Sequence, residues 1–290
     1  MYTILPALSE ADTQAPGINH ETRNWYFERA TGSDHLLITI GDSWTWGDAL
    51  GRIHYDHDNS PNNVNDDYEH RTTHIYGAVL AGQLGSDHLN LARCGCGNNW
   101  MYEQLVRFLP DLVKKYNKIT VVITLTEIGR DSASRYWIPD VDMTTLPGFL
   151  TSLERNTFKK FKEVFDNYPD ITFLVGRNFT FTYPENYQYC QQHLLKTWIE
   201  LIEGQQDIGR YPRSVRMMSG LAFTPVTEII EQHGLQNKFK AELLEEMTLA
   251  TEAIAWLEQS KLNSPWATKH PTEQAHELWA NYLYNTITNK

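Results

Sequence analysis

The chain has 290 residues, of which 41% are hydrophobic, so it is long and apolar enough to form one large α/β domain. Its formal net charge is −11 and its Lys and Arg residues form no basic run. Nucleic acid is therefore not an expected partner, because an acidic chain repels a phosphate backbone. No apolar run approaches the length of a membrane-spanning helix, so no membrane partner is expected either.

Residues 1–17 lack the basic and apolar segments of a secretory signal. The 3 cysteines of this long chain imply no disulfide framework, and a reducing compartment is the default for such a protein. We therefore expect a cytoplasmic or otherwise non-secreted protein, and the sequence leaves its oligomeric state open.

Five segments have the composition of buried strands, because they are short, apolar, rich in β-branched residues and bounded by turn-forming residues. They are residues 35–40, 88–92, 118–125, 170–175 and a shorter candidate at 213–218. Helical spacing of apolar residues predicts helices over 73–84, 100–116, 146–168, 186–203, 238–259 and from Pro271 onward. In the last helix we expect His276 to face solvent and the following residues to be buried: Ala275, Leu278, Trp279, Tyr282 and Leu283.

Alternation of strands and helices predicts a three-layer, flavodoxin-like α/β sandwich with a central parallel sheet of about five strands. Residues 1–34 are polar and irregular, and we expect them to form an N-terminal arm on a single domain over residues 35–290. In such sheets sites form beyond the carboxyl ends of the strands. The residues that follow Ile40, Ala92, Leu125 and Val175 are therefore the candidates for function.

Gly41, Asp42 and Ser43 follow the first of these strands. A serine hydroxyl on a tight turn can act as a nucleophile when a base lies beside it, and glycine supplies the backbone freedom for the turn. The alternative is that Gly-Asp-Ser is an ordinary turn at the end of a strand. The G-x-S-x-G elbow of the α/β-hydrolases is absent, because Thr45 stands where its second glycine would be.

Residues 38–47, Ile-Thr-Ile-Gly-Asp-Ser-Trp-Thr-Trp-Gly, resemble the opening motif of the GDSL/SGNH hydrolases. Residues 90–98, with Gly95 in a glycine-rich turn after the second strand, are similar to the second motif of that family. His270, followed by Pro271 and a helix, matches the last motif in its histidine, proline and helix. The resemblance covers roughly residues 35–285.

The resemblance implies a hydrolase of carboxylic esters in which Ser43 is the nucleophile and His270 the general base. It also implies that backbone N–H groups of Ser43 and Gly95 bind the oxyanion, and that neither a metal nor an organic cofactor is required. The expected partner is a small-molecule or carbohydrate ester. Trp and Tyr residues near 44–46, 100–102 and 136–137 favour a short acyl group on a carbohydrate as the substrate.

The chain departs from the family pattern at two positions. The third family motif, Gly-x-Asn-Asp, is replaced by residues 126–131, and Ala267 stands where the acid of the triad is expected. Side chains that could serve the site instead are Asp42, which can hold the turn, and three candidate donors to the oxyanion, Asn98, Thr126 and Arg130. Asn263 or Ser264 could orient the histidine.

These departures leave other functions open. One alternative is a catalytically weakened SGNH-like module that binds a glycan or a protein, and another is a structural or assembly protein. Residues 48–70 are expected to form a long loop. His70 and His74 have the spacing of neighbours on one helix face, which suggests a metal site, but a solvated polar loop is the preferred interpretation. Cys94 and Cys96 are interpreted as a reduced pair.

Overall fold

The computed structural model describes residues 3–5, 26–47, 50, 68–93, 96–126, 142–177, 189, 193–198, 201, 230–231, 234–242, 266–267, 270–271 and 273–289. The predicted strand at 213–218 lies outside the described residues, as does most of the predicted helix at 238–259. None of the described helices is long and apolar enough to span a bilayer.

The core of the fold is a seven-stranded sheet with the strand order β1-β2-β4-β3-β5-β6-β7. Five neighbouring strands of this sheet are parallel, namely β4 (Asp87–Asn90), β3 (His35–Gly41), β5 (Lys118–Leu125), β6 (Thr172–Arg177) and β7 (Leu194–Thr197). Their order places the second strand beside the first, and the third, fourth and fifth on its other side, which is the flavodoxin-like order. The predicted fold class is therefore confirmed.

Two further strands extend the sheet beyond β4. They are β2 (Tyr26–Arg29), antiparallel to β4, and β1 (Thr3–Leu5), antiparallel to β2. The expectation that residues 1–34 are irregular is thus wrong for both segments, because each satisfies its backbone hydrogen bonds along a sheet edge that the sequence pattern does not reveal.

The alternating side chains of the central strands are buried on both faces of the sheet. In β3, Leu36, Ile38 and Ile40 join one core cluster, whereas Leu37 joins the other. Val122 of β5 lies on the same face as Leu37. Because successive residues of a strand point to opposite faces, a continuous apolar run indicates a strand that is covered on both sides.

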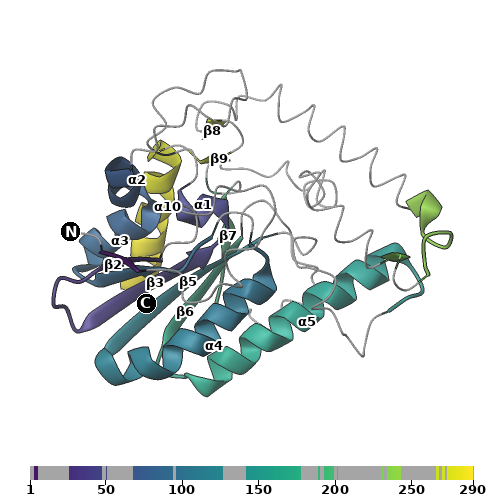
Figure 1. Cartoon of the computed structure of the whole chain (residues 1–290), viewed down its shortest axis with the longest axis horizontal. Coiled ribbons are helices and arrows are strands. Elements are labelled where there is room, and N and C mark those ends of the chain that lie inside the picture. Colours follow the sequence, from purple (N-terminus) through teal and green to yellow (C-terminus); the bar gives the residue numbers. More distant parts are fainter. Residues whose placement is uncertain are drawn as a thin grey trace.

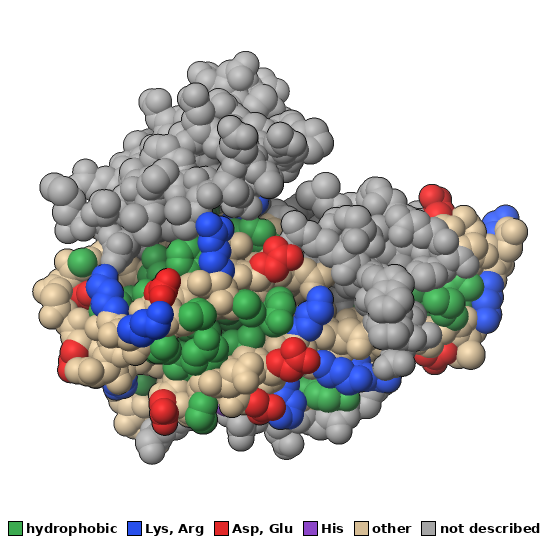
Figure 2. All heavy atoms as spheres, turned by 60° about the horizontal axis from the view of Figure 1, so that its bottom comes forward, with side chains coloured by type: hydrophobic (Ala, Val, Ile, Leu, Met, Phe, Trp, Pro, Cys, Tyr) green, Lys and Arg blue, Asp and Glu red, His purple; other side chains and the backbone are tan. Residues whose placement is uncertain are grey.

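Helices cover the two faces and make three layers (Figure 1). Helices α4 (Asn98–Lys115) and α5 (Leu146–Asn167) pack on one face, and α3 (Tyr76–Leu84), α10 (Glu273–Thr288) and α2 (Tyr68–His74) lie on the other. Two short elements, α1 (Ser43–Trp46) and the antiparallel pair of β8 (Trp266–Ala267) and β9 (His270–Pro271), lie near the carboxyl ends of the strands. Figure 2 looks toward the side of α4 and α5, where acidic, basic and hydrophobic side chains are interspersed.

Three local predictions are wrong. Strand β7 occupies residues 194–197 within the predicted helix over 186–203, because pairing with β6 overrides local helical spacing. Helix α2 begins at Tyr68, inside the segment that was interpreted as a loop. In α10, Leu278 is 43% exposed and His276 is fully buried, the reverse of the expectation, whereas Ala275, Trp279 and Leu283 are buried as predicted and Tyr282 is partly buried.

Candidate active site

Ser43 is the first residue of helix α1, and only Asp42 separates it from the carboxyl end of β3, the sheet's central strand. Asp42 caps this helix, because its Oδ1 accepts a hydrogen bond of 3.0 Å from the N–H of Trp44. Gly47 ends the helix with a φ of 84°, and its N–H donates to the Ser43 carbonyl at 3.1 Å. The turn that carries Ser43 is therefore held at both ends, and the residue itself is 6% exposed.

A buried polar network ties this turn to the neighbouring strand. The second carboxylate oxygen of Asp42 accepts a hydrogen bond of 2.8 Å from the hydroxyl of Thr126, which follows β5. The side chain of Asn98, at the start of α4, accepts from the Thr126 N–H at 2.9 Å and donates to the Thr126 carbonyl at 3.0 Å. Three of the four accessory candidates thus lie together, and these bonds use their polar groups to hold the site in shape.

Gly41 allows α1 to lie close against the end of β3. A Cβ at this position would lie 2.7 Å from the Cβ of Thr45 and 3.2 Å from the Cβ of Thr124. Both neighbours are buried, so neither can move aside without disturbing the packing. The glycine is therefore required by the close approach of the helix to the sheet.

The turn after β4 is anchored to the same strand end. The N–H of Arg93 donates to the Gly41 carbonyl at 3.0 Å, and the thiol of Cys96 donates to that carbonyl at 3.2 Å. Cys96 is a buried free cysteine, as expected for a reduced residue. Cys94 and Gly95 stand between these two anchors in the sequence and lie outside the described residues.

The strand that carries His270 lies against the helix that carries Ser43. Cα atoms of β9 and α1 approach within 8 Å of one another, although the two elements are far apart in sequence. In the β8–β9 pair Ala267 is the direct partner of His270. The position where the resemblance expects an acid is therefore next to the histidine, but it holds a methyl group. Arg130, Asn263 and Ser264 lie outside the described residues.

No family model and no curated protein matches the chain. Several solved structures show a partial likeness. One is a carbohydrate esterase whose active site has divergent catalytic and non-catalytic binding functions, with a TM-score of 0.43 and 14% identity over 90% of this chain and 67% of its own.

A second is a family two carbohydrate esterase from Clostridium thermocellum in complex with cellohexaose, with a TM-score of 0.41 and 16% identity over 91% of this chain and 66% of its own. An acetylxylan esterase from Geobacillus stearothermophilus has a TM-score of 0.36 and 15% identity over 88% of this chain and 95% of its own. The chain thus spans about two thirds of the length of the first two.

The aromatic residues near the turn are packing residues rather than a surface for sugar rings. Trp44, Trp46 and Trp100 are 4%, 2% and 7% exposed, and Tyr102 packs against the core cluster beneath α4 and α5. Residues 136–137 lie outside the described residues. The described tryptophans therefore do not support the stacking surface that the composition suggested.

Tyr76 and His276 belong to a buried polar cluster that the sequence pattern does not indicate. The hydroxyl of Tyr76 lies 3.3 Å from that of Thr124, at the end of β5, and burial raises the pKa of Tyr76 to about 12. The N–H of Tyr76 donates to Nδ1 of His276 at 3.1 Å. Helical spacing placed Tyr76 on a helix, but no local signal indicates which distant side chains it meets.

Metal-ligating side chains gather at one place among the described residues. His70, His74 and Glu273 each offer a ligand atom, and these atoms lie within 4.8 Å of one another. None of the candidate catalytic residues belongs to this cluster.

Proposed function

We propose that the chain is a serine-dependent hydrolase of carboxylic esters of the GDSL/SGNH type, with Ser43 as nucleophile and His270 as general base. The observation that carries the proposal is the meeting of α1 and β9 beside the end of the central strand. Residues from the opening and closing motifs of the resemblance thereby belong to neighbouring elements, at the edge of the sheet where sites of this fold form.

In the proposed reaction the Ser43 hydroxyl attacks the ester carbonyl while His270 takes its proton. The tetrahedral intermediate collapses, the carbon–oxygen bond to the alcohol breaks, and His270 returns the proton to the leaving alcohol. Water then hydrolyses the acyl-enzyme with the same base. The products are a carboxylic acid and an alcohol, and neither a metal nor an organic cofactor takes part.

For the oxyanion we propose the backbone N–H groups of Ser43 and Gly95. The N–H groups in the first turn of a helix have no partner within the helix and point beyond its start. The hydrogen bonds of Arg93 and Cys96 to Gly41 tie the segment on each side of Gly95 to the same strand end. Preorganised donors of this kind are commonly the largest contribution to catalysis of acyl transfer.

One observation favours the alternative, a binding module with little activity. Ala267 faces His270 across the β8–β9 pair, so the imidazole lacks a carboxylate from this position. A carboxylate in such a triad holds the imidazole in the correct tautomer and stabilises its charged form. The alternative therefore expects a carbohydrate or a protein to bind at the same turn without being hydrolysed.

Labelling with a fluorophosphonate, read by intact mass, separates the two functions. The esterase proposal expects a single adduct on the native protein, lost in Ser43→Ala and in His270→Ala. Ser33→Ala is the matched control, since Ser33 is partly exposed and precedes the amino end of the same strand, and its labelling should equal that of the native protein. A native protein that neither labels at Ser43 nor hydrolyses p-nitrophenyl acetate faster than Ser43→Ala contradicts the proposal.

For the substrate we propose a short acyl group on a carbohydrate. Because Trp44, Trp46 and Trp100 are buried, other residues must contact the sugar. Acetate release from acetylated xylo-oligosaccharides should exceed release from acetylated peptides and from long-chain p-nitrophenyl esters at equal concentration. Faster release from the peptides or the long-chain esters would reject this substrate class and leave the nucleophile assignment intact.

A further inference from the structure

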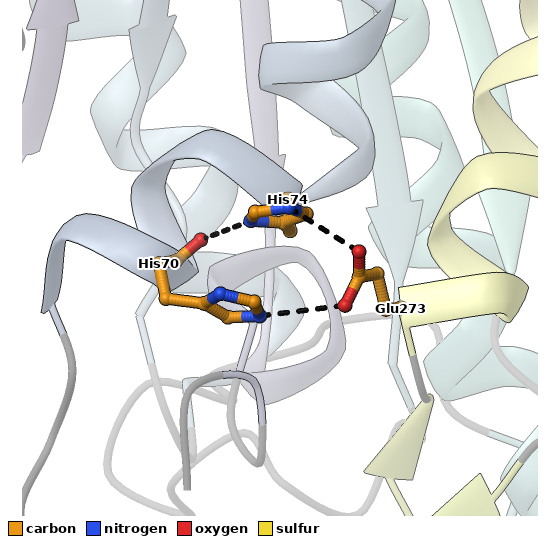
Figure 3. A group of neighbouring side chains, drawn as sticks. All are labelled: His70, His74 and Glu273. Carbon is orange, nitrogen blue, oxygen red and sulfur yellow. Dashed lines mark hydrogen bonds and ion pairs between the residues drawn. The ribbon is translucent and has the colours of Figure 1, made fainter. Parts of the chain in front are cut away.

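His70, His74 and Glu273 form a compact cluster at the junction of two helices (Figure 3). The histidines share one face of α2, and Glu273 is the first residue of α10. Nε2 of His70 lies 3.4 Å from Oε2 of Glu273, and Nε2 of His74 lies 3.2 Å from its Oε1. Both imidazoles therefore direct the same ring nitrogen at one carboxylate.

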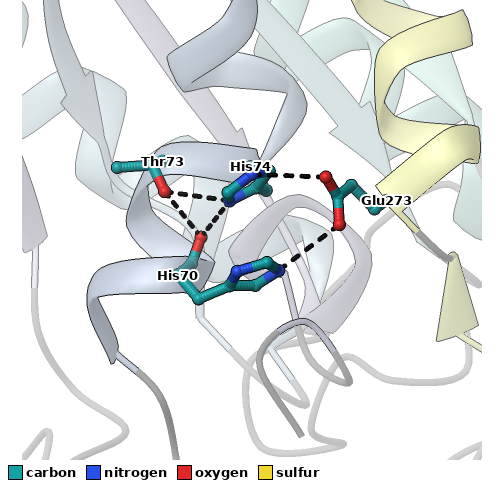
Figure 4. Close-up of polar contacts among 4 residues, drawn as sticks. All are labelled: His70, Thr73, His74 and Glu273. Atoms are coloured by element: carbon teal, nitrogen blue, oxygen red, sulfur yellow. Dashed lines mark hydrogen bonds and ion pairs between the residues drawn. The ribbon is translucent and has the colours of Figure 1, made fainter. Parts of the chain in front are cut away.

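The proton on the His74 ring is assigned by its other contacts (Figure 4). Its Nδ1 lies 2.8 Å from the main-chain carbonyl of His70, which can only accept, so Nδ1 carries a hydrogen and donates it. Thr73 donates its own hydroxyl to that carbonyl at 2.9 Å. A neutral His74 consequently presents the lone pair of Nε2 to a carboxylate oxygen. Two electron-pair donors in contact require a cation between them.

A metal ion held by all three side chains can supply that cation, because each of them offers a ligand atom. The two imidazole rings stack with centroids 3.9 Å apart and planes inclined by 17°, so the rings must rotate for both in-plane Nε2 lone pairs to point at one ion. Charge-assisted N–H···O bonds are about 2.7–2.9 Å long, shorter than both contacts here. Ligand atoms at about 2.0–2.1 Å from a tetrahedral Zn²⁺ are about 3.3 Å apart, close to both contacts, and each histidine contacts a different oxygen of Glu273.

We propose that His70, His74 and Glu273 bind one divalent transition-metal ion of the Zn²⁺ class. Imidazole nitrogens favour such ions, whereas Mg²⁺ and Ca²⁺ prefer sites made of oxygen. The donation of His74 Nδ1 to a main-chain carbonyl is the outer contact that commonly orients a metal-bound histidine. The side chains are 35–45% exposed, so solvent completes the coordination and the ion has a path of entry.

The bound ion would join α2 to the start of α10. Arg71, between the two histidines, places its guanidinium carbon 3.6 Å from the centre of the Trp46 ring in α1. Glu273 follows β9, the strand that carries His270, after only one intervening residue. The ion would therefore link α2, which contacts α1, to α10, the helix that follows β9. The metal site does not depend on the proposed esterase activity.

Zn²⁺ titration of chelator-treated full-length protein, by calorimetry and by thermal unfolding, tests the site. The native protein should bind one Zn²⁺ and gain about 5 °C or more in Tm when Zn²⁺ is in hundred-fold excess over its Kd. His74→Ala and Glu273→Gln should each weaken binding at least about tenfold, as loss of a ligand does. Glu277→Gln, an exposed carboxylate one turn further along α10, is the matched control and should bind like the native protein.

Failure of the native protein to bind Zn²⁺ would overturn the proposal. Binding that is unchanged in both His74→Ala and Glu273→Gln would overturn it as well, because the ion would then lie at another site. All three ligand side chains are partly exposed, so the variants should fold, and far-ultraviolet circular dichroism checks this. Co²⁺ supplies a second measurement: native protein should show the visible absorption of four-coordinate Co²⁺, and its absence would also count against the site.

Discussion

In the proposed site, Ala267 stands at the position where an ordinary triad has its acid. It lies directly across from His270 in an antiparallel pair, and side chains at such positions have Cβ atoms about 4.5–5.5 Å apart. We therefore expect a carboxylate introduced at position 267 to reach the imidazole of His270. The proposed reaction would therefore depend on the side chain at position 267.

We expect Ala267→Asp to raise kcat/KM for p-nitrophenyl acetate at least about tenfold, because the carboxylate would orient His270 and stabilise its charged form. Initial rates measured beside Ala267→Asn, which has the same shape without the charge, isolate the effect of the carboxylate. An equal rise in both variants, or none in Ala267→Asp, would argue against His270 as the base.

At the scale of elements, the site depends on how closely α1 approaches the end of β3. Gly41 permits the approach, and the bonds between Asp42, Thr126 and Asn98 connect β3, β5 and α4 around it. Each partner comes from a different element. A change that separates α1 from the sheet should therefore disturb both stability and the reactivity of Ser43.

Gly41→Ala should lower the free energy of unfolding by about 1–3 kcal/mol and slow fluorophosphonate labelling of Ser43, because the added methyl group overlaps Thr45 and crowds Thr124. Gly82→Ala is the matched control. A Cβ at this exposed position in α3 meets nothing within 4 Å, so the change should stabilise the helix by up to about 1 kcal/mol and leave labelling unchanged. Urea unfolding of both variants measures the difference, and equal stabilities would refute the role assigned to Gly41.

At the scale of the whole molecule, stability should depend on a histidine that is buried in its neutral form. Nε2 of His88, in β4, contacts the hydroxyl of Thr39 in β3 at 2.9 Å. Burial lowers the pKa of His88 from 6.5 to about 3, and the nearby Arg29 acts in the same direction. The imidazole of His88 therefore stays neutral in the folded protein at pH values at which it is protonated in the unfolded chain.

The free energy of unfolding should accordingly be greatest above pH 6.5 and fall as the pH decreases toward 3, with His88 contributing up to about 1.4 kcal/mol per pH unit. His35, whose pKa is also lowered by burial, adds to the same trend. Denaturant unfolding should be measured between pH 7 and pH 4.5. The pKa of Asp87 is lowered from its ordinary value of 3.8, so this carboxyl group does not titrate within that range. His88→Gln should show a shallower decrease, and an unchanged slope would contradict this account.

The local sequence pattern was sufficient to predict the elements in which the order of apolar residues indicates which side chains are buried. The continuous apolar runs of β3 and β5 and the helical spacing of α4 and α5 predicted both the elements and the layered parallel fold. The position of Ser43 after the first buried strand, and thus at the edge of the sheet where sites form, also followed from the sequence. These inferences hold because periodicity and turn chemistry act over a few residues.

Only the tertiary structure determined which distant residues meet. The edge strands β1 and β2, and β7 within an apparent helix, exist because sheet partners supply their hydrogen bonds. The burial of His276 and the approach of Glu273 to His70 and His74 depend on how α10 packs against α2 and α3. The local sequence determines the periodicity of the elements and the turns between them. Contacts between remote side chains depend on how the elements pack, and the local sequence pattern does not predict this packing.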